Sequence, residues 1–189
     1  MPDTTIVMLP GWMGSGPEHW QTIWEAEHPD YRRAEMRNWQ STHLADWVEC
    51  LDTALAAVPG DALLVAHSLG CLAVVWWVAR HAHRTSPVRG AMLVAPPCLT
   101  SAPGLLPALA SFAPVPSAPL PFPSLVVASE NDPYARFEEA VGMASAWGSE
   151  LRNIGRAGHI NTASGHGAWP EGKQLLAGFV ASARESVHR

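Results

Sequence analysis

The stretch ALLVAHSLGCLAVVWWVA (residues 62–79) decides the fold. It runs for 18 residues without a Lys, Arg, Asp or Glu, near the minimum length of a membrane-spanning helix. Its middle, His67–Gly70, interrupts the apolar run with polar and small residues. The part before the interruption is apolar on both faces, as buried strands of parallel sheets are. The stretch therefore predicts a strand over 62–66, a turn, and a helix over about 71–81 at the centre of a soluble domain.

The turn AHSLG (66–70) fits the pattern G-x-S-x-G, with Ala in the first position. In this pattern a serine sits on a sharp turn between a strand and a helix, and its flanking residues must be small. Ala66 and Gly70 meet that requirement. The dipole of the following helix favours negative charge beside the serine hydroxyl. Ser68 is thus a candidate nucleophile, and an ordinary serine in a strand-to-helix turn is the alternative.

Apolar runs and helical spacings alternate along the rest of the chain. Further strands are predicted at 6–9, 31–36, 91–94, 125–128 and 151–154, and further helices at 19–26, 44–58, 137–147 and 172–183. Ser41 or Thr42 is available to cap the helix at 44–58. The alternation predicts a single α/β domain over 1–189, a three-layer αβα sandwich around a mostly parallel sheet.

A nucleophilic serine needs a base, and the base needs an acid that orients it. Asp132 follows the predicted strand 125–128, and His159 follows the predicted strand 151–154. Both lie at C-terminal strand ends, where open α/β sheets place their sites. The sequence therefore predicts a Ser68, Asp132 and His159 triad.

Several side chains compete for these roles. Glu130 is an alternative acid, although it sits nearer the strand end than Asp132. His166 lies beyond the expected turn, and His67 is predicted to point away from the nucleophile as a packed histidine. His19 is expected to reach the mouth of the site, without a position at a strand end.

Acyl transfer also requires donors for an oxyanion. The backbone N–H of Leu69 is the first candidate, and Trp12 in the glycine-containing loop 10–14 is the second. Glycine lets the backbone of this loop approach closely. Trp12 and Trp169 are predicted to lie on loops near the site. The candidate substrate-binding residues are Gly11, His19 and Trp169.

The segment 96–123 holds nine prolines and no charge over 28 residues, which is long for an irregular connection. Two compatible interpretations remain open. One is an apolar loop packed on the sheet edge. The other is a lipophilic wall over a substrate pocket, built from Leu105, Leu106, Leu109, Phe112 and Phe122. Whether such a wall acts as a lid is left open by the sequence.

Composition excludes several classes of protein. Of 189 residues, 48% are hydrophobic and 15% charged, which excludes a disordered chain or a coiled coil. The net charge of −5, without a basic run, argues against nucleic acid or an anionic membrane as partner. Scattered histidines, no HExxH and no CxxC predict no metal, and the loop at 11–16 lacks the Lys-Ser/Thr of a nucleotide-binding turn, so no cofactor is expected. Three cysteines and an N-terminus without signal-peptide features predict a cytoplasmic protein.

The chain resembles the small serine hydrolases of the α/β-hydrolase superfamily that include retinoblastoma-binding protein nine and the YdeN-like proteins. The resemblance rests on LPGWMGSGPEHWQTIWE (9–25), DWVECLDTAL (46–55), LVAHSLGCLAVVWW (64–77), PFPSLVVASENDPY (121–134) and AWGSELRNIGRAGHINTASGHGAWPEG (146–172). It implies the same triad, Ser68, Asp132 and His159, and a compact sheet without a cap domain. Ala66 in place of the usual glycine departs from the superfamily pattern.

These observations together predict a serine hydrolase that cleaves small-molecule esters, thioesters or amides through an acyl-enzyme. A protein-interaction module that keeps the hydrolase scaffold with little activity is the alternative, since the uncharged segment 96–123 would suit a partner surface. Acyl transfer to an acceptor other than water would use the same residues. The sequence leaves the acyl chain length, the preference for ester or amide and the oligomeric state open.

Overall fold

The computed structural model describes residues 4–81, 87–101 and 104–186, without the side chains of 105, 106 and 184–186. The strands are β1 (Thr5–Leu9), β2 (Arg32–Arg33), β3 (Ala62–His67), β4 (Val88–Val94), β5 (Ser124–Ala128) and β6 (Glu150–Asn153). The helices are α1 (Trp20–Glu27), α2 (Leu44–Ala56), α3 (Leu69–Arg80), α4 (Leu105–Ala108), α5 (Phe137–Trp147) and α6 (Pro170–Ser186), with short 3-10 helices η2 (Ala110–Phe112) and η3 (Thr162–Ser164).

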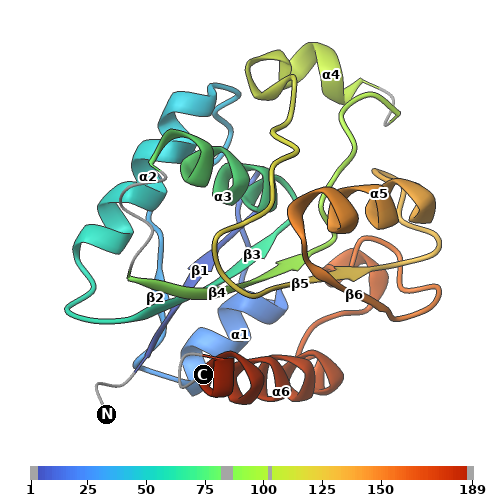
Figure 1. Cartoon of the computed structure of the whole chain (residues 1–189). Helices are drawn as coiled ribbons and strands as arrows, with labels where there is room; N and C mark the ends of the chain where they lie inside the picture. Colours follow the sequence, from blue (N-terminus) through green and yellow to red (C-terminus); the bar gives the residue numbers. More distant parts are fainter. Residues whose placement is uncertain (1–3, 82–86, 102–103, 187–189) are drawn as a thin grey trace.

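The strands form one sheet in the order β2-β1-β3-β4-β5-β6, with parallel pairing between neighbours. Helices α2, α3 and α5 cover one face of this sheet, and α1 and α6 cover the other (Figure 1). The predicted α/β class and three-layer αβα arrangement are therefore confirmed. In the part of the chain that the structure describes, no separate cap domain lies over the sheet.

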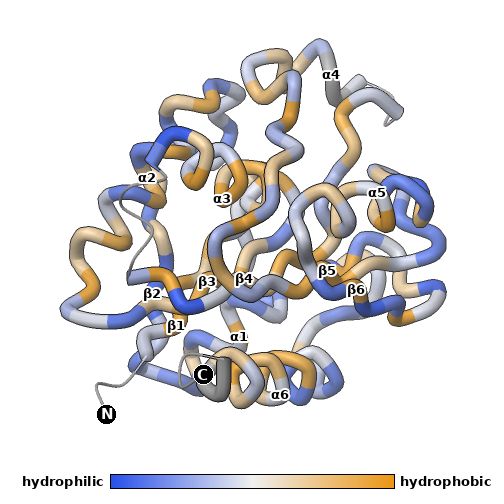
Figure 2. The backbone as a smooth tube through the Cα atoms, in the orientation of Figure 1, coloured by the Kyte–Doolittle hydropathy of each residue, from blue (hydrophilic) through white to orange (hydrophobic). Residues whose placement is uncertain are grey.

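Alternating side chains of the strands divide the core into two layers. In β3, Leu64 and Ala66 pack with α2, α3 and α5, whereas Leu63 and Val65 pack with α1 and α6. This alternation is the two-residue period of a strand that is covered on both sides. Colouring by hydropathy shows mostly apolar residues in the inner strands β1, β3 and β5, whereas the edge strands β2 and β6 are polar (Figure 2).

The stretch 62–79 forms the predicted strand, turn and helix. All six residues of β3 are buried, and α3 begins at Leu69, earlier than the predicted start near 71. The helix begins early because Ser68 itself is its N-cap residue, so the turn is a single residue long. None of the described helices has both the length and the apolar character needed to cross a bilayer.

The predicted strand at 31–36 is shorter than expected and is reduced to Arg32–Arg33. As the edge strand, β2 pairs only with β1 among the described strands. The Arg33 guanidinium turns toward α1, where it binds Glu25 at 2.5 Å and donates to Thr22 Oγ1 at 2.7 Å. These side-chain contacts anchor the edge of the sheet to α1.

The predicted cap of α2 needs a correction. The N-cap residue is His43, whose side chain makes no capping hydrogen bond. Ser41 lies two residues earlier, where its hydroxyl accepts the His43 N–H at 3.2 Å and donates to the Asp46 carboxylate. The serine therefore stabilises the approach to the helix through a carboxylate in the first turn.

Other boundaries shift by a few residues. Strand β4 begins at Val88 instead of 91, β6 spans Glu150–Asn153 instead of 151–154, and α6 spans Pro170–Ser186 instead of 172–183. The start of α6 follows from proline, whose fixed φ and missing N–H suit the first turn of a helix.

The proline-rich segment 96–123 contains α4 and η2, so its expected lack of regular structure is partly wrong. Phe112 is fully buried and packs against the Trp47 ring, with centroids 6.3 Å apart. Indole N–H groups bind the segment to the sandwich, from Trp76 to Phe112 O and from Trp147 to Pro116 O, each at 2.9 Å. The segment is thus fastened to the body of the protein, and the predicted contributions of the Leu105 and Leu106 side chains fall outside the described residues.

Candidate active site

The turn between β3 and α3 holds Ser68 in an unusual backbone conformation. Its φ of 52° and ψ of −122° are rare for a residue with a side chain, and such conformations cluster at functional sites. The Ser68 N–H donates to Val94 O at 2.9 Å, which fixes the turn to the neighbouring strand. The hydroxyl is consequently raised above the C-terminal edge of the sheet.

Two glycines make room for this turn. A Cβ on Gly70 would lie 2.6 Å from the carbonyl oxygens of Leu9 and Pro10, so α3 could not approach β1 so closely with any side chain there. A Cβ on Gly11 would lie 2.8 Å from the Cβ of Ser68. The loop after β1 therefore lies directly against the turn that carries Ser68.

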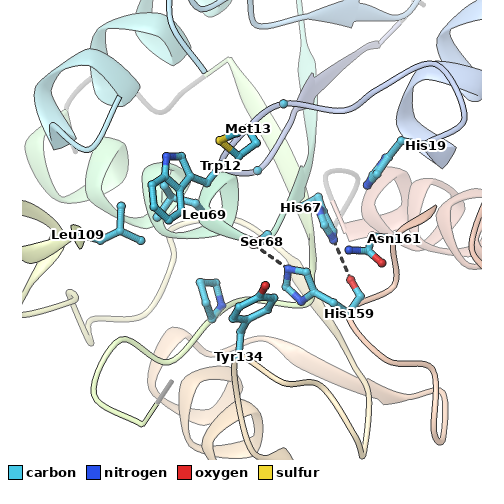
Figure 3. Close-up of a pocket in the computed structure, with 13 residues that line it drawn as sticks. Trp12, Met13, His19, His67, Ser68, Leu69, Leu109, Tyr134, His159 and Asn161 are labelled. Atoms are coloured by element: carbon cyan, nitrogen blue, oxygen red, sulfur yellow. Dashed lines mark hydrogen bonds between the residues drawn. The ribbon is translucent and has the colours of Figure 1, made fainter. Parts of the chain in front are cut away.

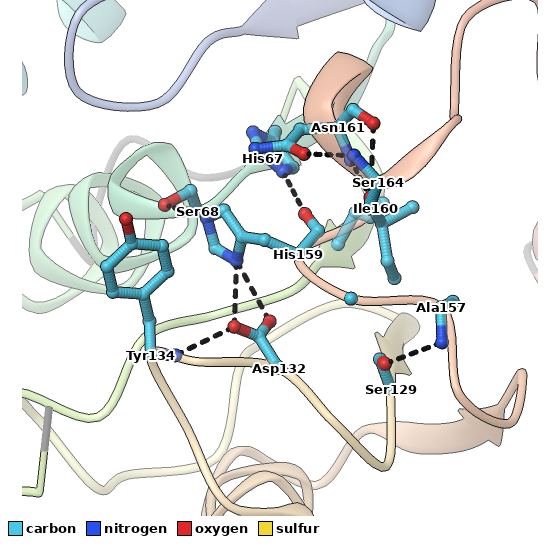
Figure 4. Close-up of polar contacts among 12 residues, drawn as sticks. His67, Ser68, Ser129, Asp132, Tyr134, Ala157, His159, Ile160, Asn161 and Ser164 are labelled. Atoms are coloured by element: carbon cyan, nitrogen blue, oxygen red, sulfur yellow. Dashed lines mark hydrogen bonds and ion pairs between the residues drawn. The ribbon is translucent and has the colours of Figure 1, made fainter.

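Ser68, His159 and Asp132 lie in hydrogen-bond contact (Figure 4). The Ser68 hydroxyl is 2.9 Å from Nε2 of His159, and Nδ1 of His159 is 2.9 and 3.0 Å from the two Asp132 carboxylate oxygens. The histidine and aspartate side chains are only 8% and 4% exposed, so the hydrogen bond between them is shielded from water. This geometry allows the imidazole to accept the serine proton while the carboxylate holds the opposite nitrogen.

Hydrogen bonds join the loops after β5 and β6, which places the candidate acid and the candidate base at a fixed separation. The hydroxyl of Ser129 accepts the Ala157 N–H at 2.9 Å, and the side-chain oxygen of Asn131 accepts the Gly158 N–H at 2.8 Å. The Tyr134 N–H donates to Asp132 Oδ1 at 2.9 Å. One carboxylate oxygen is therefore held by backbone as well as by imidazole.

The competing acid and base lie elsewhere. Glu130 is exposed, and its carboxylate accepts the Asn153 amide at 2.9 Å. His166 contacts the Ser164 hydroxyl at 3.1 Å, and its ring meets Trp169 edge-on. Neither side chain lines the cavity at Ser68.

Two further histidines lie beside His159. His67 is 5% exposed, and its Nε2–H donates to the backbone carbonyl of His159 at 2.9 Å. Its ring lies 4.9 Å from both the His19 and the His159 rings. Burial lowers the pKa of His67 well below 6.5, and burial, Arg33 and His159 together lower the pKa of His19 to about 4. His67 is thus packed, as predicted, but it also lines the cavity at Ser68 and contacts the backbone of the candidate base, so the prediction that it points away from the site is wrong.

A cavity of about 220 Å³ opens at Ser68 (Figure 3). The predicted residues Gly11, Trp12, His19 and Leu69 all line it. Among the described backbone groups, the N–H groups of Trp12 and Leu69 donate to no protein acceptor, as an oxyanion site requires. The Trp12 ring is held by a hydrogen bond from Nε1 to Gln40 O at 3.2 Å.

Trp169 does not line the cavity, which corrects the prediction that it contributes to the site. It is 5% exposed and packs against Trp20 and Trp24, with ring centroids 5.2 and 5.8 Å away. This indole belongs to the core between the sheet and the helices α1 and α6. A loop position in the sequence therefore did not imply exposure to substrate.

The cavity also includes residues that were not predicted from the sequence to line it, namely Met13, Gly14, His67, Pro97, Tyr134 and Asn161. Tyr134 meets the His159 ring edge-on at a centroid distance of 4.5 Å. Its proximity to Asp132 in the sequence was an available signal, since it lies two residues further on. Leu109 is the one member of the predicted lipophilic wall with a described side chain that reaches the cavity.

Within the described ranges, no three His, Cys, Asp or Glu side chains are grouped as they would be around a metal ion. Large exposed hydrophobic residues in these ranges are Met13, Tyr134 and Val141. They lie outside 96–123, so the described part of that segment offers no large exposed hydrophobic side chain for a partner.

Comparison with known proteins gives a consistent result. The family model for serine hydrolases matches residues 6–178. A solved structure described as a YdeN-like hydrolase from Pectobacterium atrosepticum is 34% identical, with a TM-score of 0.85 over 95% of this chain and 92% of that one. The ydeN gene product of B. subtilis is 20% identical, with a TM-score of 0.74 over 95% of this chain and 100% of that one.

Est1E from Butyrivibrio proteoclasticus, solved with ferulic acid, is 13% identical, with a TM-score of 0.66 over 99% of this chain and 90% of that one, and it shares the fold alone. Among curated proteins, none matches the chain significantly.

Proposed function

The chain belongs to the serine hydrolase family and has the α/β-hydrolase fold, and from this premise we propose that it hydrolyses small esters, thioesters or amides through an acyl-enzyme on Ser68. The observation that carries the proposal is the hydrogen-bonded series from the Ser68 hydroxyl through His159 to Asp132, with contacts of 2.9 to 3.0 Å. Its position above the C-terminal edge of a parallel sheet supports the same conclusion.

In the first half of the reaction, the Ser68 oxygen attacks the carbonyl carbon of the substrate. The serine proton passes to Nε2 of His159, and the protonated imidazole is held by the Asp132 carboxylate. The carbonyl oxygen becomes an oxyanion, which the N–H groups of Leu69 and Trp12 stabilise. When the bond to the leaving group breaks, His159 gives the proton to the departing atom.

In the second half, water attacks the acyl carbon. His159 accepts one proton from this water, and the hydroxide adds to the carbonyl. The bond to Ser68 then breaks, and the serine oxygen recovers the proton from His159. The products are a carboxylic acid and the alcohol, thiol or amine that left first.

The size of the cavity favours small substrates. About 220 Å³ at Ser68 is below the usual range for sites that enclose drug-sized ligands. Fold neighbours include Est1E with ferulic acid and the type II thioesterase BorB from the borrelidin biosynthetic cluster. Both are consistent with ester and thioester chemistry on this scaffold, and neither assigns a substrate to this chain. Cys50, Cys71 and Cys98 are free, which fits the proposal of a reducing, cytoplasmic compartment.

The experiment is covalent labelling with a fluorophosphonate, which loses fluoride to an activated serine. Wild-type protein should carry the adduct on Ser68, located by peptide mass spectrometry, and Ser68→Ala should carry none while remaining folded. Ser145→Ala, on the exposed surface of α5, is the matched control and should label as wild type does. Absence of labelling in folded wild-type protein would reject the proposal.

A further inference from the structure

Two unlike walls border the Ser68 hydroxyl. Trp12, Leu69 and Leu109 form an apolar wall on one side, and His19 and Asn161 form a polar wall on the other (Figure 3). All five residues line the same cavity. The two ends of a bound substrate would therefore meet different chemical surroundings.

The His19 ring presents one neutral N–H donor to this cavity. Its Nδ1 accepts the Gln21 backbone N–H at 3.2 Å, so the proton of the neutral ring is on Nε2. Burial and the nearby Arg33 lower the pKa of His19 to about 4, which keeps the ring neutral near pH 7. In the described part of the chain, Nε2 of His19 has no hydrogen-bond partner.

Asn161 presents a second donor. Its side-chain oxygen accepts the Ser164 N–H at 3.1 Å and caps η3, which identifies the other side-chain atom as the NH₂ nitrogen. No hydrogen bond from this nitrogen is found among the described residues. The cap fixes the side chain, so the amide donor is held in place before any ligand arrives.

The polar wall lies on the side of the leaving group. His159 must return its proton to the leaving atom, so that atom must lie beside Nε2 of His159. Asn161 is on the same loop, two residues after His159. The His67 ring contacts both the His159 and the His19 rings, which places His19 in this part of the site too. The proposed oxyanion donors, Leu69 and Trp12, belong to the opposite wall.

On the basis of the proposed function, we propose that His19 and Asn161 form a subsite that binds an oxygen acceptor on the leaving group. The substrate class is then an ester or thioester of a small apolar acid whose leaving alcohol or thiol carries a carbonyl or carboxylate oxygen. A hydrocarbon leaving group would strip water from two donors without replacing the hydrogen bonds, and sites of this kind reject analogues that lack the polar group. His19 and Asn161 are specificity-determining residues in this account.

Two isosteric butyrate esters test the inference, one of 3-hydroxypropanamide and one of 3-methylbutan-1-ol. They differ only in a carboxamide that replaces an isopropyl group. Wild-type protein should cleave the carboxamide ester with a kcat/KM at least about tenfold higher. Asn161→Asp keeps the oxygen that caps η3 and removes the donor, and His19→Asn keeps an acceptor for the Gln21 N–H and withdraws the ring donor. Each should bring the ratio close to one.

Asn38→Asp is the matched control, because this exposed asparagine likewise accepts a backbone N–H, from Gln40 at 2.9 Å, and lies outside the cavity. It should keep the wild-type ratio. Fluorophosphonate labelling of Ser68 distinguishes a failure of the proposed subsite from a failure of the hydrolase proposal. Labelled protein that cleaves both esters equally, or neither, overturns the subsite and leaves the hydrolase proposal in place. Unlabelled, inactive wild-type protein overturns both.

Discussion

Nε2 of His67 lies 2.9 Å from the backbone carbonyl oxygen of His159. His67 immediately precedes Ser68, so one turn carries the candidate nucleophile and also holds the backbone of its candidate base. The hydrogen bond is buried, because His67 is 5% and His159 7% exposed. The separation between the serine hydroxyl and the imidazole is therefore set by two neighbouring residues of the same turn.

Loss of this hydrogen bond should lower kcat more than it changes KM. His67→Leu leaves the His159 carbonyl unpaired and frees its loop to shift, and a displacement of about 1 Å costs on the order of 100-fold in rate. His67→Gln retains a side-chain N–H and should recover part of kcat. Steady-state kinetics on a small ester, with thermal unfolding in parallel, measure both effects. Equal kcat values for the Leu and Gln variants would show that the ring acts only by packing.

Removing the charge of Asp132 should lower kcat far more than removing the charge of Glu130. Asp132→Asn replaces an acceptor of the imidazole N–H by a group that can donate, which favours the wrong tautomer and should lower kcat by about 10³- to 10⁴-fold. Glu130→Gln should change kcat by less than about twofold, since Glu130 is exposed and bonded to Asn153. The same assay on both variants identifies which of the two carboxylates orients His159. A large loss for Glu130→Gln with little for Asp132→Asn would reverse the assignment.

Two glycine-to-alanine substitutions should change the free energy of unfolding in opposite directions. The new Cβ of Gly11→Ala would lie 2.8 Å from that of Ser68, so it should displace the serine and lower both turnover and stability, the latter by about 1–3 kcal/mol. Gly142, inside α5, has no neighbouring heavy atom within 4 Å of its ideal Cβ. Gly142→Ala should therefore raise the free energy of unfolding by about 0.5–1 kcal/mol at unchanged activity. Urea unfolding of the two variants measures the difference, and destabilisation by Gly142→Ala would contradict the helix geometry.

Stability should fall in mild acid because of His19. Its pKa is about 4 in the folded protein and 6.5 is the ordinary value, so the unfolded chain binds a proton first as pH falls. The contribution of His19 to the free energy of unfolding is therefore complete above about pH 6.5 and is lost as the pH falls toward 4. His19→Asn should reduce the difference in unfolding free energy between pH 7.5 and pH 5 by about 2 kcal/mol. Urea titrations at the two pH values test this, and an unchanged difference would mean that His19 is not held neutral.

The sequence was most informative for residues whose place in the fold follows from the order of strands and helices along the chain. The run 62–79 predicted a strand, a turn and a helix, and Asp132 and His159 were placed at strand ends that a parallel sheet brings to one edge. The observed contacts among Ser68, His159 and Asp132 follow from that rule, while their catalytic roles remain predictions.

Features that depend on packing between distant segments were not accessible in this way. Trp169 is buried because the core beneath α1 and α6 takes its ring, which a loop position in the sequence does not reveal. The donors of Asn161 and His19 became apparent only when the capping hydrogen bonds of their other side-chain atoms were known. Local pattern defined the elements, and tertiary contacts defined which polar atoms stayed free to act.

Because β4 lies between β3 and β5, the chain that leaves Val94 emerges between the turn of Ser68 and the loop of Asp132. This connection returns to the sheet at Ser124, and it contributes Pro97 and Leu109 to the cavity without supplying a proposed reacting group. The proposed reacting groups and Leu109 of the apolar wall therefore come from separate parts of the chain. A designer could exchange residues 98–122 as a cassette, with both anchor points in the sheet retained, and thereby retune which acids are accepted while the reacting groups stay in place.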